Sequence, residues 1–425
     1  MPNARKIALN VIQKIFDGGY SNLVMKEVLS SNDISNTDKS FINNLVLGVV
    51  ERRLTLDYII ENASNRPIKK ISTEALFPLR MGVYQILYMD KVPDSAAVNE
   101  SVKLVKASKK PFLSGFVNGV LRGVLRAEDR YLPRECRTEK DLSVIYSCGE
   151  DIVCRLVKQY GFDITENILK TSFKIPPTVV KVNNLKISDE DFAALMSSLS
   201  VCATKADLPR MFFVKGLADI SSNEAYKKGC FHIQDLSSAS TAFFVGCKPG
   251  ERIFDVCAAP GGKTFTMAEI MGDRGEIIAG DKHPHRVKLI DDGRKRLGLS
   301  SIKPVVSDAL SFDEKLGEFD RVLCDVPCSG IGVIARKPEI KYKNSDDFCS
   351  LPDVQFEILK NASRYLKKGG TLVYSTCTLF KEENEQVIEK FLRYAPSFTL
   401  DSQKTVIPDE NHDGFFMARL INTSL

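Results

Sequence analysis

Five short apolar runs rich in β-forming residues alternate with helical patterns from Gly250 onward. Each run ends in Asp, Cys, Ser or Thr, and the stretches that contain them are ERIFDVCAAPGG, GEIIAGD, KPVVSD, EFDRVLCDVPCSG and GGTLVYST. Because strands that alternate with helices form a parallel sheet covered on both faces, we expect an α/β domain here. Ligands of such sheets bind beyond the carboxyl ends of the strands, so the polar run ends predict the place of a site.

The chain ahead of this domain has a helical pattern. From Ala4 to about Arg126, apolar residues recur at spacings of three and four, as in Ala8, Val11, Ile12 and Ile15. Turn signals interrupt the pattern at residues 17–19, 65–67 and 92–94. We therefore predict several short helices that pack as a bundle.

Three domains are the expected organisation of the chain. A length of 425 residues suggests two or three domains, at about 150 residues each. Between the helical and the α/β parts, helical stretches such as DIVCRLVKQYG mix with short strand-like runs, TVVKVNNL and RMFFVKG. We expect an all-α bundle over 1–135, a small α/β linking subdomain over 136–235 and a Rossmann-like α/β domain over 236–425.

Positive charge is concentrated in the front third of the chain. The whole chain has a net charge of +5, whereas residues 1–140 hold 22 Lys and Arg against 15 Asp and Glu, a net of +7. This excess suits a part that contacts phosphates. Arg122, Arg126 and Arg130 recur every four residues, which places them on one side of a predicted helix. A solvated face and a nucleic-acid contact both fit these arginines.

Composition excludes several classes of protein. The hydrophobic fraction of 44% and the charged fraction of 27% are close to the globular average. We find no run of about 18 apolar residues and no secretory segment at the start, so we expect a cytoplasmic protein with no membrane partner. The 11 cysteines are scattered without C-x-x-C spacing and only 4 histidines accompany them. We therefore expect reduced thiols and no metal site.

The loop after the first β-rich run has the character of a nucleoside-cofactor site. In DVCAAPGGKT, residues 255–264, small residues and two glycines let the backbone approach a ligand closely. A phosphate-binding P-loop needs a glycine five residues before Gly262, and Cys257 stands there instead, so a triphosphate is disfavoured. Asp281 ends the next run, where a carboxylate can accept hydrogen bonds from both ribose hydroxyls. A helix N-cap is the alternative role for Asp281.

Two further carboxylates and two thiols follow predicted strand ends. Asp308 closes the third run and Asp325 the fourth, and with Asp281 they suit a cofactor that carries an adenine amino group and an ammonium group, such as adenosylmethionine. Cys328 in DVPCSGIG and Cys377 in YSTCTL lie just beyond strand ends, beside polar and Gly residues. A buried structural thiol is the usual fate of a cysteine, but this placement favours a functional role for both.

The motifs DVCAAPGGKT, DVPCSGIGV followed by RKPEIKY, and YSTCTLFKEENEQVIEKFL resemble the cofactor loop and the two cysteine motifs of the Sun/Fmu family of RNA 5-methylcytosine methyltransferases. The front third, with YSNLVMKEVL, LRMGVYQILYMDKVPDSAAVNESVKL and GFVNGVLR, resembles the NusB-like RNA-binding domain carried by bacterial 16S rRNA (cytosine-C5) methyltransferases of that family. HIQDLSSAS and DGFFMARL extend the resemblance over almost the whole chain. It implies S-adenosyl-L-methionine as cofactor, small-subunit ribosomal RNA as partner and a NusB-like helical domain at the front.

The resemblance also implies roles for individual residues. Cys377 would be the nucleophile, and Cys328 the thiol that assists release of product. Asp325 would lie beside the methionine moiety and the target base, Asp281 would hold the ribose, and Asp308 would lie near the adenine. The cofactor loop would consist of Cys257, Ala258, Ala259, Pro260, Gly261, Gly262 and Lys263.

The expected reaction follows from the chemistry of cytosine. Carbon 5 is too weak a nucleophile to attack a sulfonium methyl group, so the Cys377 thiolate first adds at carbon 6. A thiol with an ordinary pKa of about 8.5 needs a nearby positive group to ionise, for which Lys263 is the candidate. Asp325 would hydrogen-bond the edge of the activated base. Because the base must leave its stack, a cytosine in a loop is the expected target.

Two other functions remain open from the sequence. A related methyltransferase could act on tRNA or protein, and an RNA-binding assembly factor could carry an inactive catalytic domain. The motif cysteines, carboxylates and glycines are all present, which weakens the second alternative, and the NusB-like front favours rRNA over tRNA. Ala335 and Lys337 replace the Arg and His common in the family, so details of base or RNA contact are expected to differ there. We expect a monomer.

Overall fold

The computed structural model describes residues 3–18, 24, 25, 27, 34–127, 129, 131–133, 135–174, 176–217 and 220–424, with only the main chain of Ser345. Arg130 and most of the motif YSNLVMKEVL lie outside the described residues. The chain divides into two compact units. The first comprises Met1–Phe173 together with Lys337–Asn344, and the second comprises Lys174–Arg336 and Ser345–Leu425.

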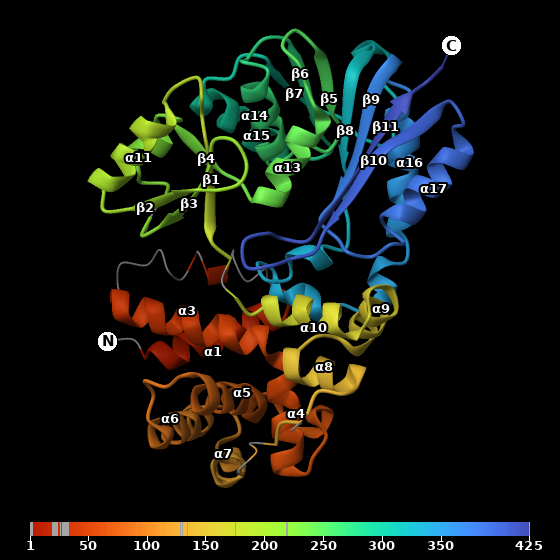
Figure 1. Cartoon of the computed structure of the whole chain (residues 1–425). Helices are drawn as coiled ribbons and strands as arrows, with labels where there is room; N and C mark the ends of the chain where they lie inside the picture. Colours follow the sequence, from red (N-terminus) through yellow and green to blue (C-terminus); the bar gives the residue numbers. More distant parts are fainter. Residues whose placement is uncertain are drawn as a thin grey trace. The chain divides into compact units, whose positions relative to one another are not determined.

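All regular structure in the described part of the first unit is helical (Figure 1). Its helices are α1 (Ala4–Phe16), α3 (Asn36–Glu51), α4 (Arg53–Ser64), α5 (Thr73–Tyr88), α6 (Asp94–Lys106), α7 (Ser114–Arg126), α8 (Glu139–Tyr146), α9 (Glu150–Tyr160) and α10 (Phe162–Thr171). The expected breaks are confirmed, because α1 ends before Asp17, Asn65 follows α4 in the left-handed conformation, and α6 begins at Asp94.

Helix α5 is the centre of this bundle. It packs against α1, α3, α4, α6 and α7, and its side chains are buried on nearly every side. Arg80 on α5 makes a bidentate ion pair with Asp57 on α4, with its Nε 2.6 Å from Oδ1 and one terminal nitrogen 2.7 Å from Oδ2. Because both side chains are almost fully buried, each charge needs the other, and the pair fixes how α4 lies on α5.

The segment Lys337–Asn344 belongs to the first unit although it is distant from it in sequence. The hydroxyl of Tyr342 donates to the backbone oxygen of Glu51 at 2.6 Å and accepts from the backbone N–H of Arg53 at 3.2 Å. The helical unit also continues to Phe173, past the boundary at residue 135 that we expected, because the first strand begins only at Thr178. Which residues make up independently folding domains stays a prediction.

The second unit begins with a small antiparallel sheet in the order β2-β3-β1-β4. Its strands are β1 (Thr178–Val182), β2 (Cys202–Lys205), β3 (Met211–Lys215) and β4 (Phe231–Ile233), accompanied by α11 (Asp189–Ser198) and α12 (Glu224–Lys227). Val180, Val182 and Phe212 face Phe192 and Met196 of α11 in a core of their own. This sheet lies within the segment expected to be an α/β linking subdomain.

The large sheet of the second unit has seven strands in the order β10-β11-β9-β8-β5-β6-β7, all of which are labelled in Figure 1. They are β5 (Arg252–Asp255), β6 (Glu276–Asp281), β7 (Ile302–Val306), β8 (Phe319–Asp325), β9 (Leu366–Thr376), β10 (Phe398–Val406) and β11 (Phe415–Asn422). The five β-rich runs identified in the sequence form β5 to β9, and these strands are parallel. The α/β fold class is confirmed.

One strand, β11, runs against the parallel sheet that we expected, whereas β10 runs in the same direction as β5 to β9. β11 pairs antiparallel with both β9 and β10. The physical reason is the short connection of residues 407–414 between β10 and β11, because a parallel crossover needs about a dozen residues or more. The motif DGFFMARL therefore supplies a strand that adjoins the site.

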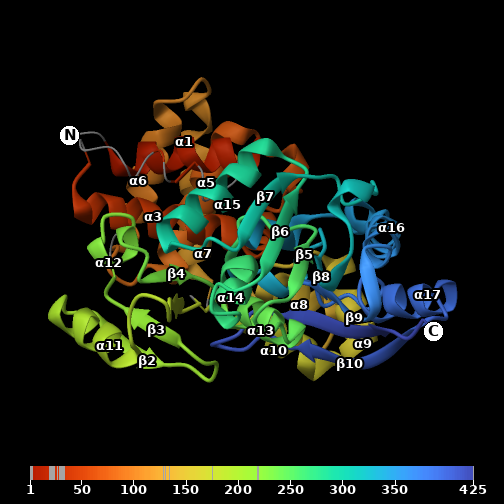
Figure 2. The same ribbon diagram turned by 90° about the horizontal axis from the view of Figure 1, so that it is seen from above.

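Helices cover both faces of the large sheet, as Figures 1 and 2 show. They are α13 (Leu236–Val245), α14 (Gly262–Ile270) and α15 (Pro284–Leu297) on one face, and α16 (Leu351–Ser363) and α17 (Glu385–Tyr394) on the other. Successive strand residues enter opposite cores: Ile253 packs with α13 to α15, whereas Phe254 packs with α16 and α17. Because the side chains of a strand alternate between two faces and both faces are buried, the strands appear in the sequence as continuous apolar runs.

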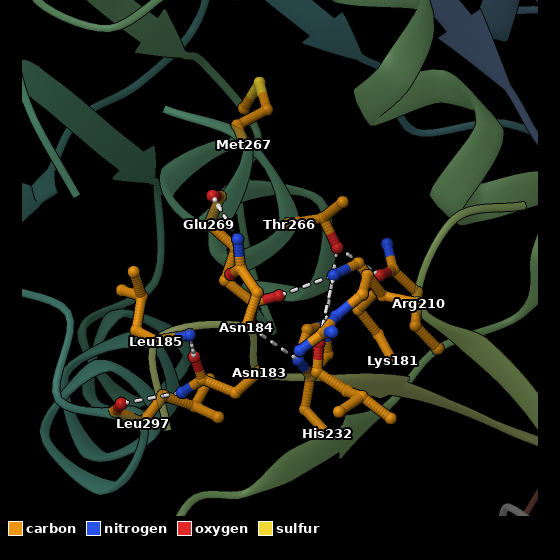
Figure 3. A network of polar contacts seen from close by, with 12 residues as sticks. Lys181, Asn183, Asn184, Leu185, Arg210, His232, Thr266, Met267, Glu269 and Leu297 are labelled. Carbon is orange, nitrogen blue, oxygen red and sulfur yellow. Dashed lines mark hydrogen bonds and ion pairs between the residues drawn. The ribbon is translucent and has the colours of Figure 1, made fainter. Parts of the chain in front are cut away.

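A buried polar network joins the small sheet to α14 (Figure 3). The ammonium group of Lys181 on β1 lies 2.7 Å from the carboxylate of Glu269 on α14, and both side chains are almost completely buried. His232 and Gln234 hydrogen-bond each other at 3.2 Å, and Thr266 on α14 donates to Gln234 at 2.5 Å. Because α14 begins at Gly262, within the expected cofactor loop, these contacts fix where that loop lies.

Candidate functional site

The polar residues that were expected to mark a site gather at one edge of the large sheet. Asp281 is the last residue of β6 and Asp325 the last of β8, while Cys377 directly follows β9. Asp308 lies two residues beyond the end of β7. Parallel strands bring their carboxyl ends to one edge, and the register of β8 with β9 places Asp325 opposite Ser375.

Cys328 and Cys377 lie side by side. Their sulfur atoms are 3.2 Å apart, which is a hydrogen-bond contact, and neither cysteine is in a disulfide. The hydrogen bond to Cys377 and burial raise the pKa of Cys328 well above the ordinary value. Cys328 is therefore protonated and can donate a hydrogen bond to the Cys377 sulfur.

Lys263 and Asp325 form an ion pair beside the thiols. The ammonium group of Lys263, in the first turn of α14, lies 2.7 Å from Oδ2 of Asp325, and Ser375 donates to Oδ1 at 2.8 Å. Burial by itself would lower the pKa of Lys263, but the charges of Asp325 and Asp255 and the Cys377 thiol outweigh it and raise the pKa. Lys263 therefore carries a positive charge that interacts with Cys377. The site combines two thiols, a cation and a carboxylate.

The expected cofactor loop, residues 257–263, runs from just after β5 into the first turn of α14. Gly261 has a φ of +114°, and a Cβ there would stand 2.4 Å from the ring of Phe265, so only glycine fits. The N–H of Ala258 donates to the oxygen of Gly280 at 2.8 Å, which ties the loop to the end of β6. Burial raises the pKa of the Cys257 thiol, so this side chain is an uncharged part of the loop.

Asp255 lies under this loop and is fully buried. Its Oδ2 accepts from Thr264 at 2.7 Å, whereas its Oδ1 has no hydrogen-bond partner in the protein. Burial raises the pKa of Asp255 to about 7 although the Thr264 hydrogen bond acts in the opposite direction. An acceptor without a partner beneath a glycine-rich loop fits a ligand that brings a donor, such as an ammonium group.

Asp281 is buried at the base of the same edge. Oδ1 accepts from the backbone N–H of His283 at 3.0 Å, and Oδ2 lies 3.2 Å from Arg286, which also donates to the oxygen of Ala259 at 2.8 Å. The N-cap of α15 is His283, so the alternative role of Asp281 as that helix cap is wrong. Asp281 instead links β6 through Arg286 to the loop.

Asp308 is the most loosely held of the three carboxylates. It pairs with Lys282 at 2.9 Å and accepts from the N–H of Leu310 at 3.1 Å. The hydrogen bond from Lys282 is the first cause that lowers the pKa of Asp308. Asp308 is therefore ionised, and it lies where a ligand along the ends of β6 and β7 would meet it.

Glu383 holds the loops that carry Cys328 and Cys377, and its role was not predicted from the sequence. Its carboxylate is 1% exposed and accepts from the N–H of Ser329 and the amide of Gln355, both at 2.9 Å. The hydroxyl of Tyr374 donates to its backbone oxygen. Glu383 stands in the charged run KEENE, which reads as a solvated loop, so no pattern indicates that this one carboxylate turns inward.

The loop that carries Cys377 is held by its neighbours. Thr376 donates to Oδ1 of Asn384 at 2.6 Å, and the Asn384 amide donates to the oxygen of Thr378 at 3.0 Å. The hydroxyls of Thr378 and Ser329 are 2.6 Å apart, so the two cysteine loops are joined directly. These contacts hold the loops of Cys328 and Cys377 against each other at Ser329 and Thr378.

Within the described ranges, we find no group of three or more His, Cys, Asp or Glu side chains placed to hold a metal ion. The same ranges contain no helix whose length and apolar character would let it cross a membrane.

Comparison with known proteins gives matches over both parts of the chain. The family described as 16S rRNA methyltransferase RsmB/F matches residues 242–421, and the NusB family matches residues 2–126. The chain is 36% identical to the probable ribosomal RNA small subunit methyltransferase B of Bacillus subtilis (strain 168), over 94% of this chain and 90% of that protein. It is 33% identical to the ribosomal RNA small subunit methyltransferase B of Proteus mirabilis (strain HI4320), over 99% and 98%. The crystal structure of PH0851 superposes with a TM-score of 0.82 at 25% identity and covers 99% of each chain.

Proposed function

The chain belongs to the RsmB/F family of 16S rRNA methyltransferases and carries a NusB domain, and from this premise we propose that it methylates carbon 5 of one cytosine in small-subunit rRNA. The resemblance to the Sun/Fmu family and to NusB is thereby confirmed. The observation that carries the proposal is the pair of thiols, 3.2 Å apart and next to the Lys263–Asp325 ion pair. Two thiols at one site suit a reaction in which one attacks the base and the other assists its release.

Cys377 is the proposed nucleophile. Its sulfur forms a bond to carbon 6 of cytosine, and the electron pair of the C5–C6 double bond makes carbon 5 nucleophilic. Lys263 favours the thiolate by its charge, and Cys328 keeps its own proton because its pKa is raised. Burial and the contact with Cys377 disfavour the Cys328 thiolate, which supports Cys377 as the attacking group.

Asp325 and the cofactor loop hold the reactants. Asp325 accepts a hydrogen bond from the amino group of the cytosine and keeps its edge in place while charge develops. S-adenosyl-L-methionine would supply the methyl group. Residues 257–263 suit its methionine part, Asp281 its ribose and Asp308 its adenine, and the unpaired Oδ1 of Asp255 suits its ammonium group.

Release requires two bonds to break. Solvent water accepts the proton from carbon 5, the electron pair of that C–H bond re-forms the C5–C6 double bond, and the Cys377 sulfur departs from carbon 6 with the electrons of the C–S bond. Cys328 is the group that assists this elimination, since its sulfur is in contact with that of Cys377. The product is 5-methylcytosine and free Cys377.

RNA binding would involve the helical unit. Its basic excess suits phosphate contacts, which position an RNA without reading its bases. The target base must leave its stack to reach Cys377, so a loop cytosine is the proposed substrate. The protein would act as a monomer in the cytoplasm.

Bisulfite sequencing of total RNA tests the proposal. Cells with and without the gene are compared, and purified protein with S-adenosyl-L-methionine is then added to RNA from the deficient cells. We expect one cytosine of 16S rRNA to lose its methyl group in the deficient cells and to regain it in vitro. Loss of the mark in tRNA instead would establish the alternative substrate, and no lost mark in any RNA would refute the activity.

A further inference from the structure

Three segments that have no part in the proposed reaction meet at one point beside the thiols. They are Asp235 of HIQDLSSAS, Arg336 of RKPEIKY and Asp413 of DGFFMARL. Nε of Arg336 lies 2.6 Å from Oδ2 of Asp413, and a terminal nitrogen lies 3.2 Å from Oδ2 of Asp235. One arginine therefore bridges two carboxylates that are 178 positions apart in the sequence.

The two carboxylates have anchors of their own. Oδ1 of Asp235 caps α13 by accepting from the N–H of Ser237 at 2.8 Å, and the Ser237 hydroxyl donates to the oxygen of Asp413 at 2.7 Å. Asp235 and Asp413 are 13% and 7% exposed in their side chains, whereas Arg336 is 35% exposed. Burial and the charge of Asp235 raise the pKa of Asp413 to about 6, against the effect of Arg336. The two anchored carboxylates therefore form a binding site for the guanidinium group of Arg336.

Arg336 ends the loop that begins with Cys328. Near its start, the loop is held by Glu383 through the N–H of Ser329. In its middle, the N–H of Gly332 donates to the oxygen of Cys377 at 3.0 Å. After Arg336 the chain leaves the second unit and joins the first, so Arg336 lies at the end of the part of this loop that belongs to the second unit.

The tripeptide Asp413-Gly414-Phe415 touches each part of the site in turn. Asp413 binds Arg336, and the N–H of Gly414 donates to the oxygen of Gly332 at 2.7 Å. A Cβ on Gly332 would lie 2.1 Å from the oxygen of Gly414, so the backbones are in close contact. The ring of Phe415 lies 5.0 Å from the ammonium group of Lys263. A shift of this tripeptide or of Arg336 would therefore move the thiol loops relative to Lys263.

We propose that Arg336 is a positioning residue: by bridging Asp413 and Asp235 it fixes the Cys328 loop and so sets the distance between the two thiols. It touches neither base nor cofactor in this role. For turnover the inference rests on the proposed function, because Cys328 is assigned to the release step. The geometric part, that Arg336 controls the distance between the thiols, stands without it.

The first test measures the thiols without RNA. Full-length protein and the variant Arg336→Gln are treated with copper phenanthroline in air, which oxidises adjacent thiols to a disulfide, and the Cys328–Cys377 bond is quantified by peptide mass spectrometry. We expect the variant to form this disulfide roughly tenfold more slowly, because a displacement of about 1 Å strongly reduces reactions between aligned groups. Arg336→Lys should recover part of the rate. An unchanged rate in Arg336→Gln overturns the inference whether or not the protein methylates RNA.

A matched control comes from the same sheet. Arg419 on β11 is 33% exposed and pairs with Asp401 at 2.7 Å, so its own exposure resembles that of Arg336, whereas its partner is 42% exposed and Asp413 is 7% exposed. Arg419→Gln loses an arginine–aspartate ion pair away from the Cys328 loop and should oxidise at the wild-type rate. If it slows equally, the effect of Arg336→Gln is a general loosening of the sheet and the positioning role is refuted. Asp413→Asn removes the carboxylate of the same ion pair and should slow disulfide formation as Arg336→Gln does.

The second test uses 16S rRNA and S-adenosyl-L-methionine under single-turnover conditions. In Arg336→Gln we expect a covalent protein–RNA complex to form but to decay roughly 10- to 100-fold more slowly than in the wild type, with KM little changed. If formation and decay of the covalent complex slow equally, Arg336 has no specific effect on the release step, and that part of the proposal is refuted. If the wild type shows no turnover, the proposed function fails, and the oxidation rates still decide the role of Arg336.

Discussion

Replacing Lys181 by Met should destabilise the second unit by about 3–5 kcal/mol, because it leaves a buried carboxylate without its cation. The Lys181 side chain is 3% exposed and that of Glu269 is not exposed at all. Other contacts of Glu269 do not replace the lost cation. Oε1 of Glu269 has no hydrogen-bond partner, and His232 is 3.6 Å away from it. An exposed ion pair would contribute only about 0–1 kcal/mol.

Hydrogen exchange followed by mass spectrometry measures this loss in the second unit alone. Amides of β5 and β6 lie in the centre of the large sheet and exchange when the unit unfolds. At 25 °C a loss of about 3–5 kcal/mol accelerates their exchange by roughly two to three and a half orders of magnitude. Lys227→Met is the control, because Lys227 and its partner Glu224 are 53% and 72% exposed.

The double variant Lys181→Met/Glu269→Met decides the cause. If the unpaired carboxylate is responsible, removing it as well should restore much of the stability, since apolar replacement of a buried pair is often neutral. A single variant that exchanges as slowly as Lys227→Met, or a double variant no better than the single one, would refute the reasoning.

Three further changes have defined outcomes. Asp281→Ala should weaken binding of S-adenosyl-L-methionine by about 1.5–3 kcal/mol in calorimetry, and unchanged affinity in the folded variant would remove Asp281 from the site. Because the pKa of Asp255 is raised to about 7, its proton stabilises the fold below about pH 4 and this stability is lost as pH rises through 7. Asp255→Asn should lack this loss, which is at most about 1.4 kcal/mol per pH unit, when unfolding is compared at pH 5 and 8; parallel curves would contradict it. Tyr342→Phe removes the hydroxyl partner of two partly buried backbone groups and should destabilise the helical unit by about 1–3 kcal/mol in exchange measurements on α3, and no change would show that water replaces the hydroxyl.

The strand ends were predictable because their position depends on local pattern alone. Each apolar run forms one parallel strand, and parallel strands bring Asp281, Asp325 and Cys377 to one edge wherever they stand in the sequence. Their chemical roles rest on the family resemblance and stay proposals.

Long-range contacts were not predictable. Glu383 lies in a charged run, and only the buried loop of Ser329 makes its carboxylate an acceptor. The bridge from Arg336 to Asp413 joins segments with no shared pattern. The return of Lys337–Asn344 to the helical unit likewise depends on burial of Tyr342 against helices that lie almost 200 or more residues earlier. The antiparallel β11 was hidden in a motif recognised only by resemblance.

The most direct test of the account is the covalent complex between protein and 16S rRNA, separated by denaturing electrophoresis and mapped by mass spectrometry. Cys328→Ala should still attack and methylate the base but release it slowly, so a complex linked through Cys377 should accumulate. Cys377→Ala and the double variant should form none and should not methylate. A complex in the double variant, or full turnover in Cys377→Ala, would contradict the assignment of Cys377 as the nucleophile.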